Sequence, residues 1–595
     1  MERNEIAQNL KWKTSDIFPT DEAWEAEFAA VENEYSNYDF SAYKGKLGDK
    51  ATLLKYFELS DTMSRRIELL YLYAHLTHDV DVRVSKYTSM NARVSAMISK
   101  IFAQLSFVEP ELTALDESVL QSFIADPDFK DYDYRLRQIA ASKAHILSEN
   151  EERLLTLGGD VMREFRGIFS MLDNANLNLP KAKFKGEEVQ MSHGMYGVVL
   201  HTGTGEERKE WFEKYYQAYI NLIDAISQTY YANVKKNVFY KTVRKYESSM
   251  QMAMDAEDVT PTVYNNLISA VHGALPTMHD YIRLRKTETG LKEQHMYDIY
   301  VPLVEDAEIK LPFEKAYDLV IEGLAPLGED YQNLLREARD GGWIDVCENE
   351  GKRSGAYSSG VYDTHPYVLL NYQETTNDIF TVAHEMGHAL HTYKSNHTQP
   401  YAKADYTIFL AEIASTVNEV LLLKHLYKNT DDKNLKKYLL NYYMDMIRAT
   451  MFRQTQFAEF EQIAHAKAEE GIPLTKDILN GVYYQLNKDY YGDGIIHDEQ
   501  IAYEWSRIPH FYTSFYVYKY ATGIISAISI VKRILTEGES AVQDYFKFLS
   551  SGGCTDPVAI LQKAGVDLTT MAPFEVAMDE FKATLDEFKS LCESK

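Results

Sequence analysis

Apolar residues recur at three- and four-residue intervals along most of the chain, which is the spacing of one face of an α-helix. Segments with this spacing and without Gly or Pro include Ala51–Tyr71, Lys209–Val234 and Leu435–Ala468. No segment repeats at a fixed period, which disfavours a regular solenoid. The pattern therefore predicts a mostly α-helical, multi-helix protein.

Strand-like patterns are confined to two places. Tyr362–Tyr372 is rich in aliphatic and aromatic residues, and Lys181–Met191 fits a hairpin. We expect the first of these to belong to a small β-sheet near residues 340–372. Turn-rich residues cluster at Asn174–Pro180 and His201–Gly205, which predicts an N-terminal helical region over 1–200 and a second region over 201–595.

The charge balance narrows the possible functions. The chain has 62 Lys and Arg against 89 Asp and Glu, so its formal net charge is −27. A general nucleic-acid binder shows a basic surface, and binding to anionic membranes also needs basic residues. We therefore expect neither kind of partner.

Cysteine usage and hydropathy give expectations about location. The three cysteines are far apart and form no CxxC pair, which suits a reducing compartment. The first residues contain no apolar signal-peptide core, and the most apolar stretch, Tyr520–Val531, is shorter than the ~20 residues that a membrane span needs. We expect a cytoplasmic protein, with monomer and homodimer both open.

The clearest chemical motif consists of five consecutive residues, His384-Glu385-Met386-Gly387-His388, which match H-E-x-x-H. On a helix, residues four apart lie on one face, so both imidazoles can bind the same Zn²⁺. The glutamate between them is not a ligand, and its carboxylate can take a proton from the attacking water. The motif predicts a catalytic metal centre.

The surroundings of the motif support this interpretation. A chain of this composition contains roughly 0.08 chance matches to H-E-x-x-H. Thr375–Asp378 supplies candidate N-caps directly before an apolar run with helical spacing. We therefore expect one Zn²⁺ per chain, bound on a helix.

A catalytic zinc site has three protein ligands and an open position. His391 follows His388 by only three residues on the same helix and makes a poor third ligand. Glu412 is better placed, because it lies in the largely apolar helical segment Ala404–Lys428, where a carboxylate is rarely buried unless it is paired or metal-bound. Glu419 shares its face and is a candidate acceptor for a ligand imidazole, although a surface charge is an equal alternative.

The HEMGH motif and the helix around Glu412 resemble the thimet-oligopeptidase-like zinc metallopeptidases, and within them the oligoendopeptidase F group. The similarity extends over nearly the whole chain. The other segments that carry it are Trp12–Phe18, Phe165–Pro180, His295–Leu303 and Ile508–Gly523.

This resemblance implies a multi-helix body divided by a deep substrate channel, with the metal on the channel floor. It implies a zinc-dependent endopeptidase that cleaves short, unstructured peptides internally and excludes folded proteins. Carried over by residue, His384, His388 and Glu412 are the zinc ligands and Glu385 is the general base. Short peptides are the expected partners.

The resemblance also matches His510 to a late histidine of the family. Tyrosine spacing after it differs in the thimet branch, so Tyr512, Tyr516, Tyr518 and Tyr520 are all candidates. Tyr O–H and His N–H groups can donate to the oxygen that becomes charged during peptide hydrolysis. We predict catalytic roles for His510, Tyr516 and Tyr518 and a substrate contact for Tyr512, with aromatic core packing as the alternative for each tyrosine.

A second substrate contact is expected in the predicted sheet. Pro366 precedes Val368, Leu369 and Leu370, and proline is tolerated mainly in edge strands or at strand starts. An edge strand has free backbone groups that can pair with an extended peptide of almost any sequence. We predict that these three residues bind substrate in this way, and an ordinary sheet strand is the equal alternative.

Two other functions remain open from the sequence. A metallo-carboxypeptidase or dipeptidase with the same zinc helix needs a fixed cation for the terminal carboxylate, for which Arg507 or Lys519 is available. A helical peptide-binding protein with a dead site is the second alternative. The intact HEMGH motif and Glu412 speak against it.

Overall fold

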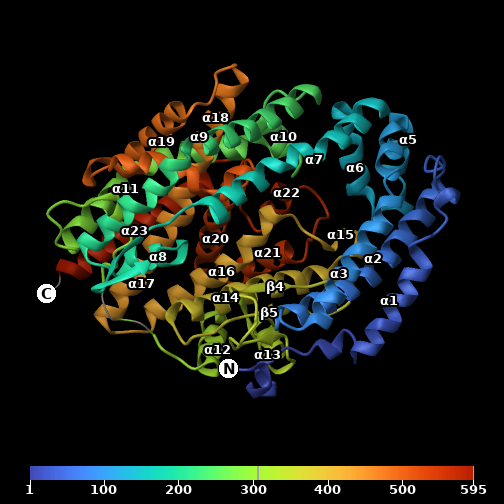
Figure 1. Ribbon diagram of the computed structural model, residues 1–595. Helices are drawn as coiled ribbons and strands as arrows, with labels where there is room; N and C mark the ends of the chain where they lie inside the picture. Colours follow the sequence, from blue (N-terminus) through green and yellow to red (C-terminus); the bar gives the residue numbers. More distant parts are fainter. Residues whose placement is uncertain (305–306, 308, 594–595) are drawn as a thin grey trace. The chain divides into compact units, whose positions relative to one another are not determined.

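Figure 1 shows a computed structural model of the chain, which describes residues 1–304, 307 and 309–593. The chain forms two compact units, each assembled from separate segments. The first unit contains Met1–Ile146, Glu308–Leu426 and Ile530–Val566, and the second contains Leu147–Ala307, Tyr427–Ser529 and Asp567–Lys595. The predicted boundary near residue 200, between an N-terminal region and a second region, stays a prediction.

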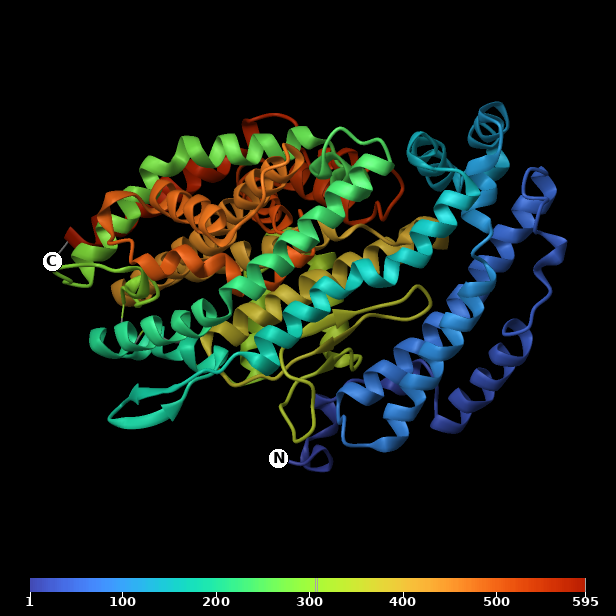
Figure 2. The same ribbon diagram turned by 45° about the horizontal axis from the view of Figure 1, so that its top comes forward.

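Helices dominate the first unit. They are α1 (Asp21–Tyr35), α2 (Lys50–Asp79), α3 (Ser85–Gln104), α4 (Val108–Ala114), α5 (Glu117–Ile124), α6 (Asp133–Ser142), α12 (Phe313–Gly323), α13 (Glu329–Asp340), α14 (Thr376–Thr398), α15 (Tyr401–Ala404), α16 (Ile408–Lys428), α21 (Glu539–Leu549) and α22 (Pro557–Lys563). The blue helices α1, α2 and α3 lie side by side (Figures 1 and 2). Trp24, Phe28 and Phe57 belong to the apolar core that they share with α4–α6.

The predicted small sheet is present in this unit. Its strands are β3 (Ile344–Asp345), β4 (Tyr357–Ser359) and β5 (Tyr367–Leu369), in the order β3-β5-β4. β5 runs parallel to β3 and antiparallel to β4. Asp345 on β3 is fully buried and forms ion pairs with Arg3 at 2.6 Å and Lys352 at 2.8 Å, which ties the first residues of the chain to the sheet.

The prediction of an edge strand at Val368–Tyr372 is wrong, because β5 is the middle strand. The backbone N–H of Val368 donates to Trp343 O and that of Leu370 donates to Asp345 O, both at 2.8 Å. Val368, Leu369 and Leu370 are also buried. Their backbone groups therefore hold the sheet together and are not available to a substrate.

The second unit is also mainly helical. Its helices are α7 (Glu149–Met171), α8 (His193–Thr202), α9 (Gly205–Val243), α10 (Ser249–Asp255), α11 (Pro261–Glu288), α17 (Lys433–Ile447), α18 (Arg453–Glu469), α19 (Lys476–Tyr491), α20 (Tyr518–Glu537), which starts in this unit, and α23 (Ala572–Glu593). The predicted hairpin is present as antiparallel β1 (Lys181–Phe184) and β2 (Glu187–Gln190), drawn as two teal arrows in Figure 2.

The segment Leu435–Ala468 differs from the single helix that its pattern predicts. A π-helical turn, Arg448–Phe452, separates α17 from α18. It places Arg448 in the interior beside Asp445, at 3.1 Å. A π-helical turn contains about one residue more than an α-helical turn, and the spacing of apolar residues does not reveal it. Such π-helical turns are frequent at functional sites.

The mostly α-helical fold class is confirmed, with small sheets as the minor component. The predicted deep channel stays a prediction. In the part of the chain that the structure describes, no helix combines the length and the apolarity that crossing a membrane requires.

Candidate metal centre

The helix that carries the HEMGH motif begins where its cap residues predict. The Thr375 hydroxyl accepts the Asp378 backbone N–H at 3.2 Å, and the Asp378 carboxylate accepts the Thr375 N–H at 2.9 Å. This capping box satisfies two donors at the start of α14. The apolar positions Ile379, Val382 and Met386 are buried, so the polar face of α14 is fixed toward the candidate metal site.

Gly387 brings α14 and α16 close together. A Cβ atom at this position would lie 2.5 Å from Ser415 Cα and 2.7 Å from Ala414 O, so only glycine fits against the α16 backbone. Asn418 on α16 donates to Ala383 O at 3.0 Å and locks the same contact. The sequence analysis did not predict that Gly387 permits this close packing of two helices, although a glycine inside the motif is the feature that could have indicated it.

This contact brings three potential ligand atoms together. His384 Nε2 and His388 Nε2 are 3.2 Å apart, and each lies 3.5 Å from Glu412 Oε2. In a tetrahedral zinc site with bonds of about 2.0–2.2 Å, neighbouring ligand atoms are about 3.3–3.6 Å apart. The two nitrogens and one carboxylate oxygen therefore fit one such ion, and no other cluster of this kind occurs among the described residues.

Glu419 contacts the other nitrogen of His384. Its Oε1 lies 2.6 Å from His384 Nδ1. Glu419 follows Glu412 by about two turns of α16. The carboxylate accepts the Nδ1 proton and leaves Nε2 to face the ligand cluster. The geometry matches the role expected from the shared helix face, rather than that of an isolated surface charge.

Strong electrostatic coupling marks the cluster. Burial lowers the pKa of His384, but hydrogen bonds to Glu412 and Glu419 outweigh it and raise this pKa to about 10. Burial raises the pKa of Glu412, but hydrogen bonds and charge attraction to His384 and His388 together outweigh burial and hold this pKa well below its ordinary value. The Glu412 carboxylate is thus ionised and attracts either protons or a metal cation.

Glu385 lies between the two imidazoles in sequence and is not part of the ligand cluster. Its side chain is buried, and burial raises the pKa of its carboxyl group. A carboxylate with a raised pKa is a stronger base than an ordinary one. His384 and His388 remain 28% and 19% exposed, so the neighbouring site is open to a small reactant.

His391 lies outside the cluster. Its ring is fully buried and stacks on Tyr406 with centroids 3.8 Å apart. Burial lowers its pKa to about 3, so the imidazole is neutral. It packs α14 against the loop before α16.

In the second unit, His510 forms an accessible cluster with two of the four candidate tyrosines. His510 is exposed, and Tyr516 and Tyr520 are partly exposed. The ring of His510 lies 6.2 Å from that of Tyr516 and 6.0 Å from that of Tyr520. Burial, followed by Arg166 and Arg453, lowers the pKa of His510, which favours a neutral imidazole near pH 7.

The other two candidate tyrosines are buried. Tyr518 is 1% exposed and packs against Tyr264, with centroids 5.2 Å apart. Tyr512 is also buried and stacks on Phe169 at 4.4 Å. Burial of both rings favours the alternative of aromatic core packing, and the catalytic role of Tyr518 and the substrate contact of Tyr512 stay predictions.

The buried carboxyl group of Glu461 holds the segment that carries His510 and Tyr516. Its Oε1 accepts the Phe515 backbone N–H at 3.0 Å. Phe515 has φ of 59°, a left-handed conformation that bulky residues seldom adopt. Glu461 thus stabilises the backbone turn directly before Tyr516.

We expect Glu461→Gln to make stability less dependent on pH. Burial raises the pKa of Glu461 from 4.5 to about 8, so between these values the folded state binds a proton that the unfolded state has released. The free energy of unfolding therefore falls as pH rises through this window, by up to about 1.4 kcal/mol per pH unit. Gln keeps an oxygen acceptor and does not titrate. Thermal unfolding from pH 5 to 8 should show a smaller decline for the variant, and parallel curves would exclude this effect.

Two family models match the chain. The model described as peptidase family M3 matches residues 198–580, and the model described as oligopeptidase F matches residues 111–178. The first match alone includes the HEMGH motif, Glu412, Glu419 and His510.

Known proteins resemble the chain over nearly its whole length. Oligopeptidase PepF of Bacillus subtilis is 42% identical over 584 residues, which cover 98% of this chain and 87% of that protein. The solved structure of oligoendopeptidase-F from Enterococcus faecium is 32% identical, with a TM-score of 0.73, and 98% of this chain and 100% of that chain are covered. A solved chain from Chlamydophila abortus is 34% identical, with a TM-score of 0.93 and 99% of each chain covered.

Proposed function

Because the chain belongs to peptidase family M3, a family of metallopeptidases, we propose that it is a zinc-dependent endopeptidase that hydrolyses internal bonds of short, unstructured peptides. The cluster of His384 Nε2, His388 Nε2 and Glu412 Oε2 supports this most directly, since its spacing suits one zinc ion per chain. A zinc ion held by these residues would polarise the scissile carbonyl group and lower the pKa of a water molecule.

Glu385 is the proposed general base. Its carboxylate takes a proton from the attacking water and later passes that proton to the leaving amine. The raised pKa of this buried group suits both transfers, because a stronger base accepts the proton and its conjugate acid can still release it. Glu419 acts through His384, by fixing which ring nitrogen carries the proton.

His510, Tyr516 and Tyr520 are the proposed donors to the charged oxygen of the transition state. They form the accessible aromatic cluster of the second unit, whereas Tyr512 and Tyr518 are buried. Donors that are already fixed in position stabilise developing charge without reorganisation. The contact from Glu461 to Phe515 supports such a fixed arrangement.

A series of single substitutions tests these donors. We expect His510→Ala, and Tyr→Phe at position 516 or 520, to lower kcat by about a hundred- to a thousandfold where the group touches the oxyanion, with little change in KM. Tyr512→Phe and Tyr518→Phe are matched controls that remove a buried hydroxyl, and their kcat should stay within a few-fold of wild type. Steady-state kinetics on one quenched peptide compares all five variants. Wild-type kcat in both Tyr516→Phe and Tyr520→Phe would remove tyrosine from the mechanism.

β4 replaces β5 as the proposed strand that pairs with substrate. It is an edge of the three-stranded sheet, its residues are partly exposed, and it contacts α14. Val368, the partner of Ser358 in the register, turns its N–H toward β3, so Ser358 turns its own backbone groups away from β5. An extended peptide can add to this edge without any requirement on its side chains.

The cleavage pattern of a peptide pool tests the proposed function. The pool contains peptides of graded length with blocked or free ends, a stable folded protein and unfolded casein, and mass spectrometry identifies the products with and without chelator. We expect internal cleavage of short end-blocked peptides, no cleavage of the folded protein, slow cleavage of casein and no products with chelator.

The same experiment separates the two alternative functions. Release of terminal residues from unblocked peptides only would identify a carboxypeptidase or dipeptidase. No turnover by metal-loaded protein that still binds peptide would identify a peptide-binding protein. Lys519 does not supply the cation that a carboxypeptidase needs, because its side chain is 5% exposed and forms an ion pair with Glu257.

A further inference from the structure

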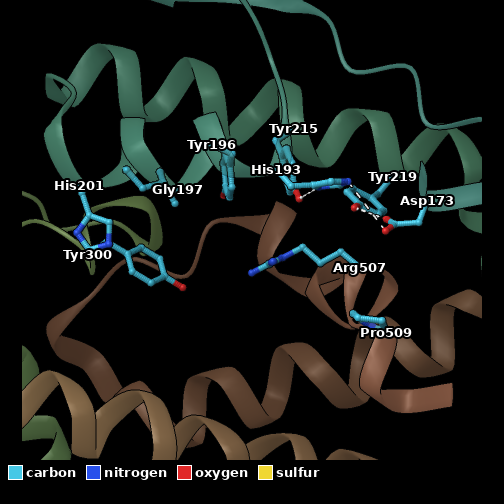
Figure 3. A pocket seen from close by; sticks show the side chains of 11 residues that line it. Asp173, His193, Tyr196, Gly197, His201, Tyr215, Tyr219, Tyr300, Arg507 and Pro509 are labelled. Carbon is cyan, nitrogen blue, oxygen red and sulfur yellow. Dashed lines mark hydrogen bonds and ion pairs between the residues drawn. The ribbon is translucent and has the colours of Figure 1, made fainter. Parts of the chain in front are cut away.

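The second unit contains a cavity of about 380 Å³ (Figure 3). Its walls come from α8, α9, Tyr300 and the segment that includes Arg507 and Pro509. Pro509 directly precedes His510, one of the proposed donors. A peptide that contacts His510 would therefore lie close to a residue that lines this cavity.

One end of the cavity has polar groups that satisfy one another. The rings of Tyr196 and Tyr215 stack with centroids 3.9 Å apart, and the Tyr215 hydroxyl lies 2.7 Å from His193 Nδ1. The Tyr219 hydroxyl donates to the Asp173 carboxylate at 2.7 Å. These groups form a wall that needs no bound ion.

Arg507 is different, because part of its guanidinium remains available. Its Nη2 donates to Glu504 Oε1 at 2.7 Å and its Nε donates to the Tyr216 hydroxyl at 3.3 Å. The Tyr215 hydroxyl also interacts with this guanidinium. Among the described residues Nη1 has no contact as short as those of Nε and Nη2, and the side chain is 20% exposed. Figure 3 shows the guanidinium and the Tyr300 hydroxyl pointing into the same space. An acceptor in the cavity can therefore bind both donors.

The charges behind the cavity are not balanced. The Glu504 carboxylate faces two guanidiniums, those of Arg453 at 2.6 Å and Arg507 at 2.7 Å. The Asp445 carboxylate likewise faces Arg448 at 3.1 Å and Arg285 at 3.4 Å. Each of these carboxylates faces two guanidiniums, so each set has one excess positive charge. Asp173, which also lines the cavity, offsets one of these two excess charges. This excess lies in a chain whose net charge is −27.

Arg448 extends this cationic group toward the cavity wall. Its guanidinium carbon lies 5.4 Å from the centre of the Tyr300 ring. Its Nη1 is buried and, in the described part of the chain, has no hydrogen-bond partner. Buried positive charge without a full set of partners is unfavourable, so an anion in the cavity would stabilise the group.

We propose that this cavity binds a carboxylate of the peptide substrate through Arg507 Nη1 and the Tyr300 hydroxyl. The carboxylate belongs to an Asp or Glu side chain or to the C-terminus, and the test below distinguishes these sources. A guanidinium edge suits a planar carboxylate, and the volume admits one side chain or chain end. This inference rests on the proposed peptidase function and adds a substrate preference to it.

The test compares pairs of quenched peptides that differ in one group. One set places Glu or Gln at each position near the scissile bond in turn, and the other has a free carboxylate or an amide at the C-terminus. For wild type, the carboxylate member of at least one pair should have a KM lower by about tenfold or more. The pair that responds identifies the source of the carboxylate. A ratio near one for every pair overturns the proposal.

Variants assign any preference to the cavity. Arg507→Gln should bring the KM ratio close to one, Tyr300→Phe should lower it in part, and Arg507→Lys should retain some of it. Lys209→Gln is the matched control, because it removes a cation from a side chain that is 57% exposed, and its ratio should equal that of wild type. An unchanged ratio in folded Arg507→Gln and Tyr300→Phe overturns the proposal. Zinc-dependent cleavage of neutral, end-blocked peptides without any carboxylate preference overturns this inference alone and leaves the proposed function intact.

Discussion

Replacement of Glu385 by Gln is expected to lower kcat by about a hundredfold or more while the protein keeps its metal ion. Gln preserves the shape of the side chain and the three ligand atoms, but it cannot accept a proton. The loss should therefore appear in the chemical step, with little change in KM. Steady-state kinetics and metal analysis of the same preparation measure both properties.

The matched control for this variant is Glu322→Gln, which removes one negative charge at an exposed position of α12. Its kcat and metal content should equal those of wild type. If Glu385→Gln retained more than about a tenth of wild-type activity, the general base would be another residue, since base catalysis is typically worth more than this.

Replacement of Glu412 by Ala should release the metal and abolish activity with it. The substitution removes one of three ligand atoms that lie 3.2–3.5 Å apart and leaves two imidazoles, which hold zinc poorly. Glu412 is partly exposed, so the fold should persist. Metal analysis after dialysis should find wild type loaded and the variant empty, with similar far-ultraviolet circular dichroism.

Glu419→Gln is the informative comparison, because Glu419 contacts His384 Nδ1 and supplies none of the three potential ligand atoms. It should still bind metal, with affinity lower by about ten- to a hundredfold, as is typical when a carboxylate that orients a ligand histidine is removed. Equal metal content in Glu412→Ala and wild type would place the third ligand elsewhere, and Glu419 would be the next residue to examine.

The metal helix was predictable because all its signals are local. Thr375 and Asp378 form the expected capping box, and the apolar positions of α14 are buried as their spacing predicts. Glu412 was recognisable as a carboxylate in an apolar helical segment. The close packing that brings it to His384 depends on Gly387, whose role is visible only when α16 is placed against it.

The sequence did not show which of the tyrosines after His510 are buried and which are exposed. The 3₁₀ turn Pro509–Tyr512, the left-handed Phe515 and the start of α20 at Tyr518 each change the direction of the chain. No single period therefore relates residue number to exposure. Tyr512 and Tyr518 enter the core for this reason, while Tyr516 and Tyr520 face His510.

The position of β5 within its sheet could not be predicted from the sequence either. Pro366 suggested an edge, but it precedes β5 (Tyr367–Leu369) and removes no hydrogen bond from it. The order β3-β5-β4 depends on which distant segments pair, and the short β3 (Ile344–Asp345) carries almost no sequence signal of its own.

Titration of the metal-free protein with zinc tests the central claim most directly. Protein stripped with chelator and then dialysed receives zinc in steps, and each step is assayed with one end-blocked, internally quenched peptide whose products are identified by mass spectrometry. Turnover should rise in proportion to bound zinc, reach its plateau at one ion per chain and yield only internal cleavage products. Full turnover by the metal-free chain, or zinc-loaded protein that leaves the blocked peptide intact, would contradict the account.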